Sequence, residues 1–181
     1  MSPFIYLINA IFDFYIVAII LRFLMQLFRA DFYNPLSQFI VRITDPVLKP
    51  LRRIIPGLGG IDISSLLFVY VICMIKILLT YSNLSLVSLL ILSFREVILT
   101  SIYIFIAMIL IRVVISWVSP GLNNPIMSVI YQISEPVMAP VRRLIPPIGG
   151  LDLSSLILLL ALQFSLQAID IWIFSPLLRL L

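Results

Sequence analysis

The chain has 181 residues, of which 62% are hydrophobic and only 11% are charged. Soluble domains carry about twice that charged fraction, so together with a mean hydropathy of +1.22 the composition predicts an integral membrane protein. The sequence contains no His, which excludes Ser-His-Asp catalysis and His-ligated metal sites, and its one cysteine, Cys73, can form no intramolecular disulfide. No metal or cofactor site is predicted.

Four apolar runs are long enough to cross a bilayer core as helices, which takes about 20 residues each. None of the runs contains an interior Gly or Pro, because these residues are concentrated in the loops that follow the first and third runs. The pattern favours four continuous transmembrane helices over the broken helices of many transporters. The predicted spans are Pro3–Phe28, Ile61–Tyr81, Val97–Val118 and Leu153–Phe174.

The connection between the second and third runs contains a further apolar stretch, Leu84–Phe94. As a helix this stretch would measure about 16 Å, which is too short to cross the bilayer core. We therefore expect either an interfacial helix or an extension of a neighbouring span.

A shift of 90 residues aligns Asn34–Leu66 with Asn124–Leu156 without a gap, and 17 of these 33 positions are identical. The chain is thus predicted to be two helix–loop–helix repeats, residues 1–81 and 97–181, joined by a connector, residues 82–96. Because each repeat has an even number of spans, both repeats would face the same way across the membrane. The predicted fold class is an all-α membrane protein with four transmembrane helices in two parallel repeats.

The basic residues predict the orientation of the chain. Nine of the twelve Lys and Arg residues lie at the loop end of the predicted spans. The positive-inside rule then places both long loops in the cytoplasm and both termini in the periplasm, in the inner membrane of a bacterial cell. The net charge of +4 suits anionic lipid headgroups better than nucleic acid.

Each long loop opens with a helix start. Asn34 and Asn124 are good N-cap residues, and each is followed by a proline at the first helical position. Apolar residues then recur at helical spacing, so we expect a short amphipathic helix that lies in the membrane interface with its apolar stripe in lipid. Pro46 and Pro136 are predicted to end these two helices.

Both loops continue with an arginine pair in a Pro-rich stretch, an Ile-Pro, a Gly pair and an Asp before two serines. The residues are Arg52, Arg53, Gly59, Gly60 and Asp62 in the first copy, and Arg142, Arg143, Gly149, Gly150 and Asp152 in the second. This pattern resembles the signature of the YggT (YlmG) family of small membrane proteins, and the resemblance covers most of the chain. One departure is that Ser65 and Ser155 stand where many relatives carry Pro.

The resemblance implies a non-enzymatic integral membrane protein. It also implies links to osmotic tolerance and potassium homeostasis, to division-gene neighbourhoods in bacteria, and to nucleoid distribution and cytochrome assembly in plastids. It brings no catalytic residues with it.

Two hypotheses explain the repeated loop. In the first, Asp62 and Asp152 cap the second and fourth spans, the Gly pairs give backbone freedom, and the Arg pairs anchor the loops to anionic lipid at about 1 kcal/mol per residue. In the second, the four arginines converge to bind a phosphate or an acidic partner. The two carboxylates argue against the second hypothesis, because they already occupy the helix ends that an anion would use.

Ionisable residues at bilayer depth are candidates for function by default. Here they are Asp13, Arg22, Lys76, Arg112 and Asp170. Arg22 and Arg112 obey the 90-residue shift and are close enough to the loops to snorkel. The other three do not obey it, so we expect Lys76 to pair with Asp170 or Asp13 and lock the two halves together. A polar path that also includes Gln163 and Gln167 is the alternative.

The expected function is that of a non-enzymatic membrane organiser or assembly factor whose cytoplasmic loops meet lipid or a partner. The spans contain few small residues for close packing, which favours association with further copies or with a larger membrane protein. The alternative is a small ion channel or transport accessory in potassium or osmotic homeostasis. A membrane enzyme is least favoured, because no His or paired carboxylates are present to serve as general acid and base.

Overall fold

A computed structural model of the chain describes residues 3–57, 59–81, 83–118, 124–145 and 152–179. These residues form helices and turns and no strand, so the predicted all-α class is confirmed. The helices are α1 (Pro3–Leu27), α2 (Pro35–Ile54), α3 (Ile63–Thr80), α4 (Leu86–Val118), α5 (Pro125–Leu144) and α6 (Leu153–Ile169), followed by a π-helical segment η1 (Asp170–Phe174) and α7 (Ser175–Arg179).

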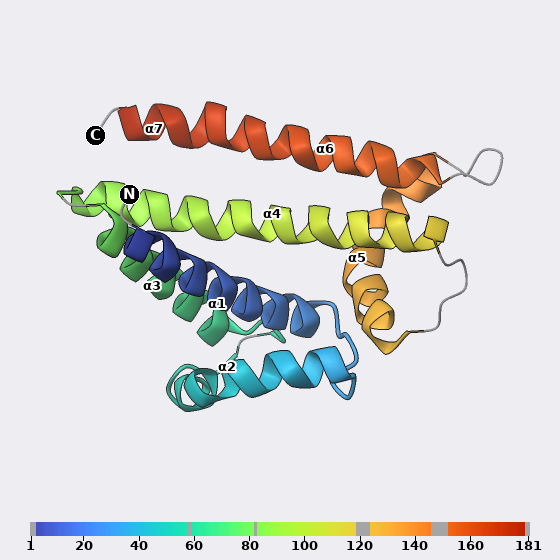
Figure 1. Cartoon of the computed structure of the whole chain (residues 1–181), viewed down its shortest axis with the longest axis horizontal. Coiled ribbons are helices and arrows are strands. Elements are labelled where there is room, and N and C mark those ends of the chain that lie inside the picture. The colour runs from blue at the N-terminus through green and yellow to red at the C-terminus, as the bar shows by residue number, and fades with distance from the viewer. Residues whose placement is uncertain (1–2, 58, 82, 119–123, 146–151, 180–181) are drawn as a thin grey trace.

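Four helices are long and apolar enough to cross a membrane, as the sequence predicts: α1, α3, α4 and the stretch formed by α6, η1 and α7. Figure 1 shows that α1 and α4 run in one direction and that α3 and α6 run in the opposite direction. Consequently α1 and α4 end, and α3 and α6 begin, on the same side of the bundle, which α2 and α5 connect and which we call the loop end. The other end, where α1 begins and α7 ends, we call the terminal end (Figure 1).

The helix boundaries follow the 90-residue spacing. Helix α5 begins and ends 90 residues after α2, and α6 begins 90 residues after α3. The side chains of Asn34 and Asn124 accept hydrogen bonds from backbone N–H groups two residues on, at 3.0 Å and 2.9 Å, and so cap α2 and α5.

The apolar stretch Leu84–Phe94 extends a neighbouring span, which is one of the two arrangements that the sequence allows. Helix α4 begins at Leu86 and has 33 residues, so it measures about 50 Å. It is thus longer than the counterpart helix α1, which has 25 residues.

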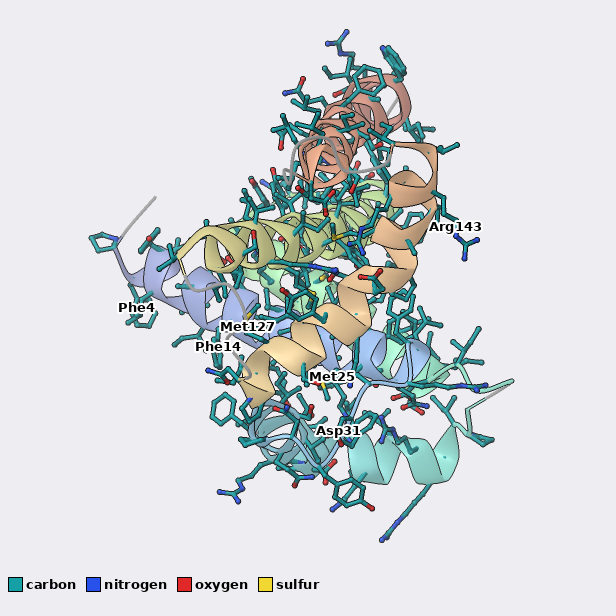
Figure 2. All side chains as sticks on the ribbon, turned by 90° about the vertical axis from the view of Figure 1, so that its right-hand side faces the viewer. Phe4, Phe14, Met25, Asp31, Met127 and Arg143 are labelled. Carbon is teal, nitrogen blue, oxygen red and sulfur yellow. The ribbon has the colours of Figure 1, made fainter. Side chains whose placement is uncertain are left out.

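The prediction that Pro46 and Pro136 end the amphipathic helices is wrong. Helix α2 continues through Pro46 and Pro50, and α5 continues through Pro136 and Pro140. A proline removes the hydrogen bond to the carbonyl four residues earlier, and its ring pushes that carbonyl away. Because the two prolines of each helix are four residues apart, both losses fall on one side, and the helix bends without ending. The bend of α2 is visible in Figure 1 and Figure 2.

The apolar stripes of α2 and α5, which were expected in lipid, lie in part against the protein's own spans, although Phe39 and Ile126 stay exposed. In α2 the buried side chains include Ile40 and Leu48, and in α5 they include Val129 and Ile133. Ile40, Leu48 and Ile133 belong to the largest apolar core, which also contains Met25 of α1. The loop helices are therefore part of the packed structure at the loop end.

Helix α6 is the least buried of the spans. In the span that α6 forms with η1 and α7, 11% of an apolar 18-residue stretch is buried, compared with 33% for α3 and 28% for α4. It packs on α4 and α5, whereas α3 packs on α1, α2 and α4. Figure 1 shows α6 at one edge of the bundle.

Candidate functional site: two basic loops held by internal ion pairs

The first loop is fastened to α1 by a buried arginine. Arg22 is 4% exposed, and its guanidinium donates hydrogen bonds to the Thr44 hydroxyl at 2.6 Å and the Val41 carbonyl at 3.3 Å. It also pairs with the Asp45 carboxylate at 2.5 Å. Because these three partners belong to α2, Arg22 holds α2 against α1. Its guanidinium is thus bound inside the protein at the side where the sequence expected it to snorkel.

The carboxylate of Asp45 has a second cation beside it, the ammonium of Lys49 at 2.7 Å. Burial disfavours the charged form of Asp45, but hydrogen bonds from Lys49 and Arg22 outweigh this effect. The pKa of Asp45 therefore lies below its usual range. The carboxylate is ionised at neutral pH and keeps both cations in place.

A second arginine joins α2 to the beginning of α3. Asp62 is 2% exposed and caps α3 by accepting hydrogen bonds from the backbone N–H of Ser65 at 3.2 Å and from its hydroxyl. The Arg52 guanidinium donates to the same carboxylate, with Nε at 3.1 Å and Nη2 as a second donor. Arg52 also reaches the Gln26 side chain of α1 at 3.3 Å. One guanidinium thus ties three helices together.

The second loop repeats this arrangement. Arg112 of α4 donates to the Ser134 hydroxyl at 3.0 Å and to the Glu135 carboxylate at 2.5 Å. Arg142 lies 3.1 Å from Glu135 and 3.6 Å from Asp152. Asp152 caps α6 by accepting from the backbone N–H of Ser154, a bond of 3.1 Å.

We call these two sets the clamps. The first clamp is Arg22, Thr44, Asp45, Arg52 and Asp62, and the second clamp is Arg112, Ser134, Glu135, Arg142 and Asp152. Their members correspond one to one at a distance of 90 residues. They differ in the cations that pair with the central acid. Lys49 pairs with Asp45 in the first clamp, but the residue that corresponds to Lys49 in the second repeat is Ala139. In the second clamp the longer Glu135 side chain reaches Arg142 instead.

The structure divides each arginine pair between two roles. Arg52 and Arg142 bind the carboxylates of the clamps, whereas Arg53 and Arg143 are exposed and their side chains make no polar contact with any described residue. Figure 2 shows Arg143 projecting away from α5. The four arginines therefore do not form one phosphate site, because one member of each pair is already bound to an acid.

The turn before α3 requires glycine at two positions. Gly59 and Gly60 have φ values of 62° and 85°, in the left-handed region that other residues adopt only with strain. Nothing lies within 4 Å of a Cβ built at either residue, so conformation and not space imposes the glycines. Gly149 and Gly150 lie outside the described residues.

A second group of charges lies toward the terminal end. The Lys76 ammonium of α3 contacts the Asp13 carboxylate of α1 at 2.5 Å and the Glu96 carboxylate of α4 at 2.6 Å. The Arg95 guanidinium binds Asp170 through two donors at 2.5 Å and 2.9 Å. Lys76 therefore pairs with Asp13, which the sequence allowed, and not with Asp170.

Sequence reasoning paired Lys76 with Asp170 or Asp13, but it assigned no partner to Arg22 or Arg112. It overlooked Glu96 and Arg95, which were placed in the connector, and it did not connect Arg22 with Asp45 or Arg112 with Glu135. A signal for the latter was available, because Asp45 and Glu135 are an acid exchange at the 90-residue spacing. For Arg95 and Glu96 no such internal counterpart exists. Among the described residues no group of three His, Cys, Asp or Glu side chains is placed to hold a metal ion.

Comparison with known proteins agrees with the repeated pattern. The sequence model of the CCB3/YggT family matches residues 1–83 and 87–174. An uncharacterized protein in the proC 3' region of Vibrio alginolyticus is 48% identical over 166 residues, which cover 88% of this chain and 89% of that protein. The uncharacterized protein YggT of Escherichia coli K12 is 37% identical over 163 residues, which cover 90% and 86%.

An uncharacterized protein of Haemophilus influenzae is 43% identical over 158 residues, which cover 87% of this chain and 86% of that protein. No solved structure matches. Since the family pattern extends over nearly the whole chain, and since these relatives share more than a third of its residues over most of their own length, the chain belongs to the CCB3/YggT family.

Proposed function

We propose that this protein is a non-enzymatic organiser of the bacterial inner membrane. Its two basic loops face the cytoplasm and bind anionic lipid headgroups, and its two chain ends face the periplasm. The clamps give each loop a fixed position on the spans, and the exposed arginines supply the binding charge.

The observation that carries the proposal is that the arginines at the loop end fall into two sets, one paired with carboxylates and one unpaired. Arg22, Arg52, Arg112 and Arg142 are bound to carboxylates, which leaves a second set of arginines that are exposed and whose side chains make no polar contact with the described residues. That second set is Arg29, Arg42, Arg53 and Arg143. Exposed cations beside the ends of membrane spans are placed to meet anionic headgroups, each worth about 1 kcal/mol at such a surface.

The test compares the affinity of the purified protein for phosphatidylglycerol and phosphatidylcholine, measured by native mass spectrometry. We expect the combined variant Arg53→Gln, Arg143→Gln to lose about 30-fold in affinity for phosphatidylglycerol, which corresponds to about 2 kcal/mol. Binding of phosphatidylcholine should not change.

The matched control is Arg179→Gln, which removes the same charge from an exposed position of α7 at the terminal end. It should leave the preference for phosphatidylglycerol intact. An equal loss in both variants, or no preference for the anionic lipid in the unmodified protein, contradicts the proposal.

The charges at the terminal end favour a second candidate, a small channel or transport accessory linked to osmotic or potassium homeostasis. Lys76 and Asp170 lie in apolar helices, where ionisable residues often mark ion pathways. Potassium and proton flux into liposomes tests this candidate. Flux that the variant Lys76→Met, Asp170→Asn abolishes would support it and contradict the organiser, whereas no flux from folded protein favours the organiser.

A further inference from the structure

The two repeats do not make the same contacts with each other. Inside the chain α3 packs closely on α4, which begins the second repeat. The counterpart of α3 is α6 and the counterpart of α4 is α1, but α6 makes no comparable contact with α1. Figure 1 shows why, since α6 lies at the edge of the bundle beyond α4. The faces of α6 and α1 that correspond to the α3–α4 interface therefore have no partner helix within the chain.

The unfilled face of α6 is not purely apolar. Leu156, Leu160, Gln163 and Gln167 follow one another at spacings of four, three and four residues, so they share one face of the helix, and all four are exposed. Neither glutamine side chain has a hydrogen-bond partner among the described residues. An apolar face needs only lipid, but an unpaired amide in the hydrocarbon region is costly and favours a polar partner on another helix.

The unfilled face of α1 carries a matching group. Tyr6, Ala10 and Asp13 share one exposed face of this helix. The Asp13 side chain remains 52% exposed although it contacts Lys76, and Lys76 divides its single charge between Asp13 and Glu96. This cluster has one more negative than positive charge, so Asp13 is an available acceptor on the surface of α1.

The two polar groups also agree in depth. Asp13 lies 14 residues from the loop end of α1, at Leu27, and Gln167 lies 14 residues from the loop end of α6, at Leu153. Both are therefore about 21 Å from that end. Helices α6 and α1 run in opposite directions (Figure 1), as α3 and α4 do, so the two faces can meet in the antiparallel manner already present inside the chain.

From this match we propose that α6 of one copy packs against α1 of a second copy, with the Gln163 and Gln167 amides facing Asp13 of the neighbour. This contact between two molecules repeats the packing of α3 on α4 that occurs within one chain. It joins two different faces, and in a dimer each copy gives its α6 and receives on its α1, so the two contacts are related by a twofold axis and the assembly is closed. Two copies are the smallest ring that satisfies both faces.

Disulfide crosslinking in native membranes tests the arrangement. Cys73 is the only cysteine of the chain and is buried, so Cys73→Ser gives a cysteine-free background. Ala10→Cys on α1 and Ile171→Cys in η1 are exposed positions at closely similar depth. We expect a crosslinked dimer when two differently tagged chains, one with each cysteine, are produced together, and none when either chain is produced alone.

The matched control pair is Val71→Cys on α3 with Leu110→Cys on α4, two positions that are 46% and 47% exposed. Equal crosslinking of this pair would indicate random collision and would overturn the proposal. Crosslinking of the Ala10→Cys or Ile171→Cys chain with itself would also overturn it, because α1 would then meet α1, or η1 would meet η1, in place of the proposed pairing of α6 with α1. Absence of the mixed dimer would do the same.

Variants of the glutamines show whether the polar groups contribute. Hydrogen bonds between membrane helices are worth about 0.6 kcal/mol on average, so Gln163→Leu with Gln167→Leu should lower the mixed-dimer yield by at least about threefold. Ser165→Ala is the control, because the Ser165 hydroxyl already donates to the Ala161 carbonyl in its own helix at 2.7 Å. An unchanged yield in the glutamine variant would overturn the assigned pairing with Asp13.

Discussion

Removal of the buried arginine of the first clamp should destabilise the protein strongly. Arg22→Met replaces a side chain that is 4% exposed and that binds Asp45 and Thr44 with an apolar one of similar length. Breaking a buried ion pair by removing one partner costs about 3–5 kcal/mol, because the other charge stays behind without compensation. Lys49 remains beside Asp45, but it is 71% exposed and compensates only weakly.

The second clamp provides a matched comparison. The Arg112 side chain is 11% exposed, and its partner Glu135 also binds Arg142. Arg112 additionally lies 4.2 Å from the centre of the Tyr131 ring, a contact worth about 0.5–2 kcal/mol. Since Glu135 keeps Arg142 when Arg112 is removed, we expect Arg112→Met to cost about 2–3 kcal/mol, less than Arg22→Met.

The assay is unfolding of the purified protein by SDS in mixed micelles, followed by circular dichroism. The double variant Arg22→Met, Asp45→Asn should recover part of the loss, because it removes the uncompensated charge as well as the pair. A cost below about 1 kcal/mol for Arg22→Met would refute the reasoning, since a buried, paired arginine cannot be that dispensable. An Arg112→Met variant that loses more than Arg22→Met would refute the comparison between the clamps.

Four further outcomes are expected. Gly59→Ala should cost about 1–2 kcal/mol in the same assay, because alanine is strained at a positive φ. Stability should fall as the pH drops below about 4, because the pKa of Asp45 is lower in the folded than in the unfolded protein. The stability that ionised Asp45 contributes is complete above the unfolded pKa and is lost as the pH falls through the folded pKa. Asp45→Asn should flatten this part of the stability profile. Lys76→Met should cost about 3 kcal/mol by leaving two carboxylates unpaired, and adding Asp13→Asn should restore part of it. A cysteine at position 53 in place of Arg53 should react with a membrane-impermeant maleimide only after the cytoplasmic side is opened, and labelling of intact cells would reverse the proposed orientation.

The parts of the fold that depend on local sequence could be predicted. Span lengths follow from runs of apolar residues, and the caps at Asn34 and Asp62 follow from residue type at a helix start. The end of α2 could not be predicted in this way. Pro46 lowers helix propensity, but the packing of Ile40 and Leu48 against the spans outweighs that loss and carries the helix on to Ile54.

The ion pairs depend on tertiary structure and were beyond local reasoning. Lys76 reaches Glu96 only because α4 begins ten residues earlier than Glu96 and packs along α3. The sequence shows that Lys76 needs a partner in the membrane, because an isolated ammonium there is costly. It does not show which carboxylate the crossing of the helices brings into reach.

The two ends of the molecule differ in how its charges relate to the repeat. The clamps occur in both repeats, and each joins a loop only to the spans of its own repeat, so each copy requires the same device to hold its loop. Asp13 and Lys76 have Tyr103 and Leu166 as counterparts, so these charges serve contacts that the repeats do not share. Lys76 indeed reaches Glu96 in the connector that leads to the second repeat. On this reasoning the loop end should carry the activity that both repeats perform. The terminal end should join the two repeats within a chain and join one copy of the chain to another.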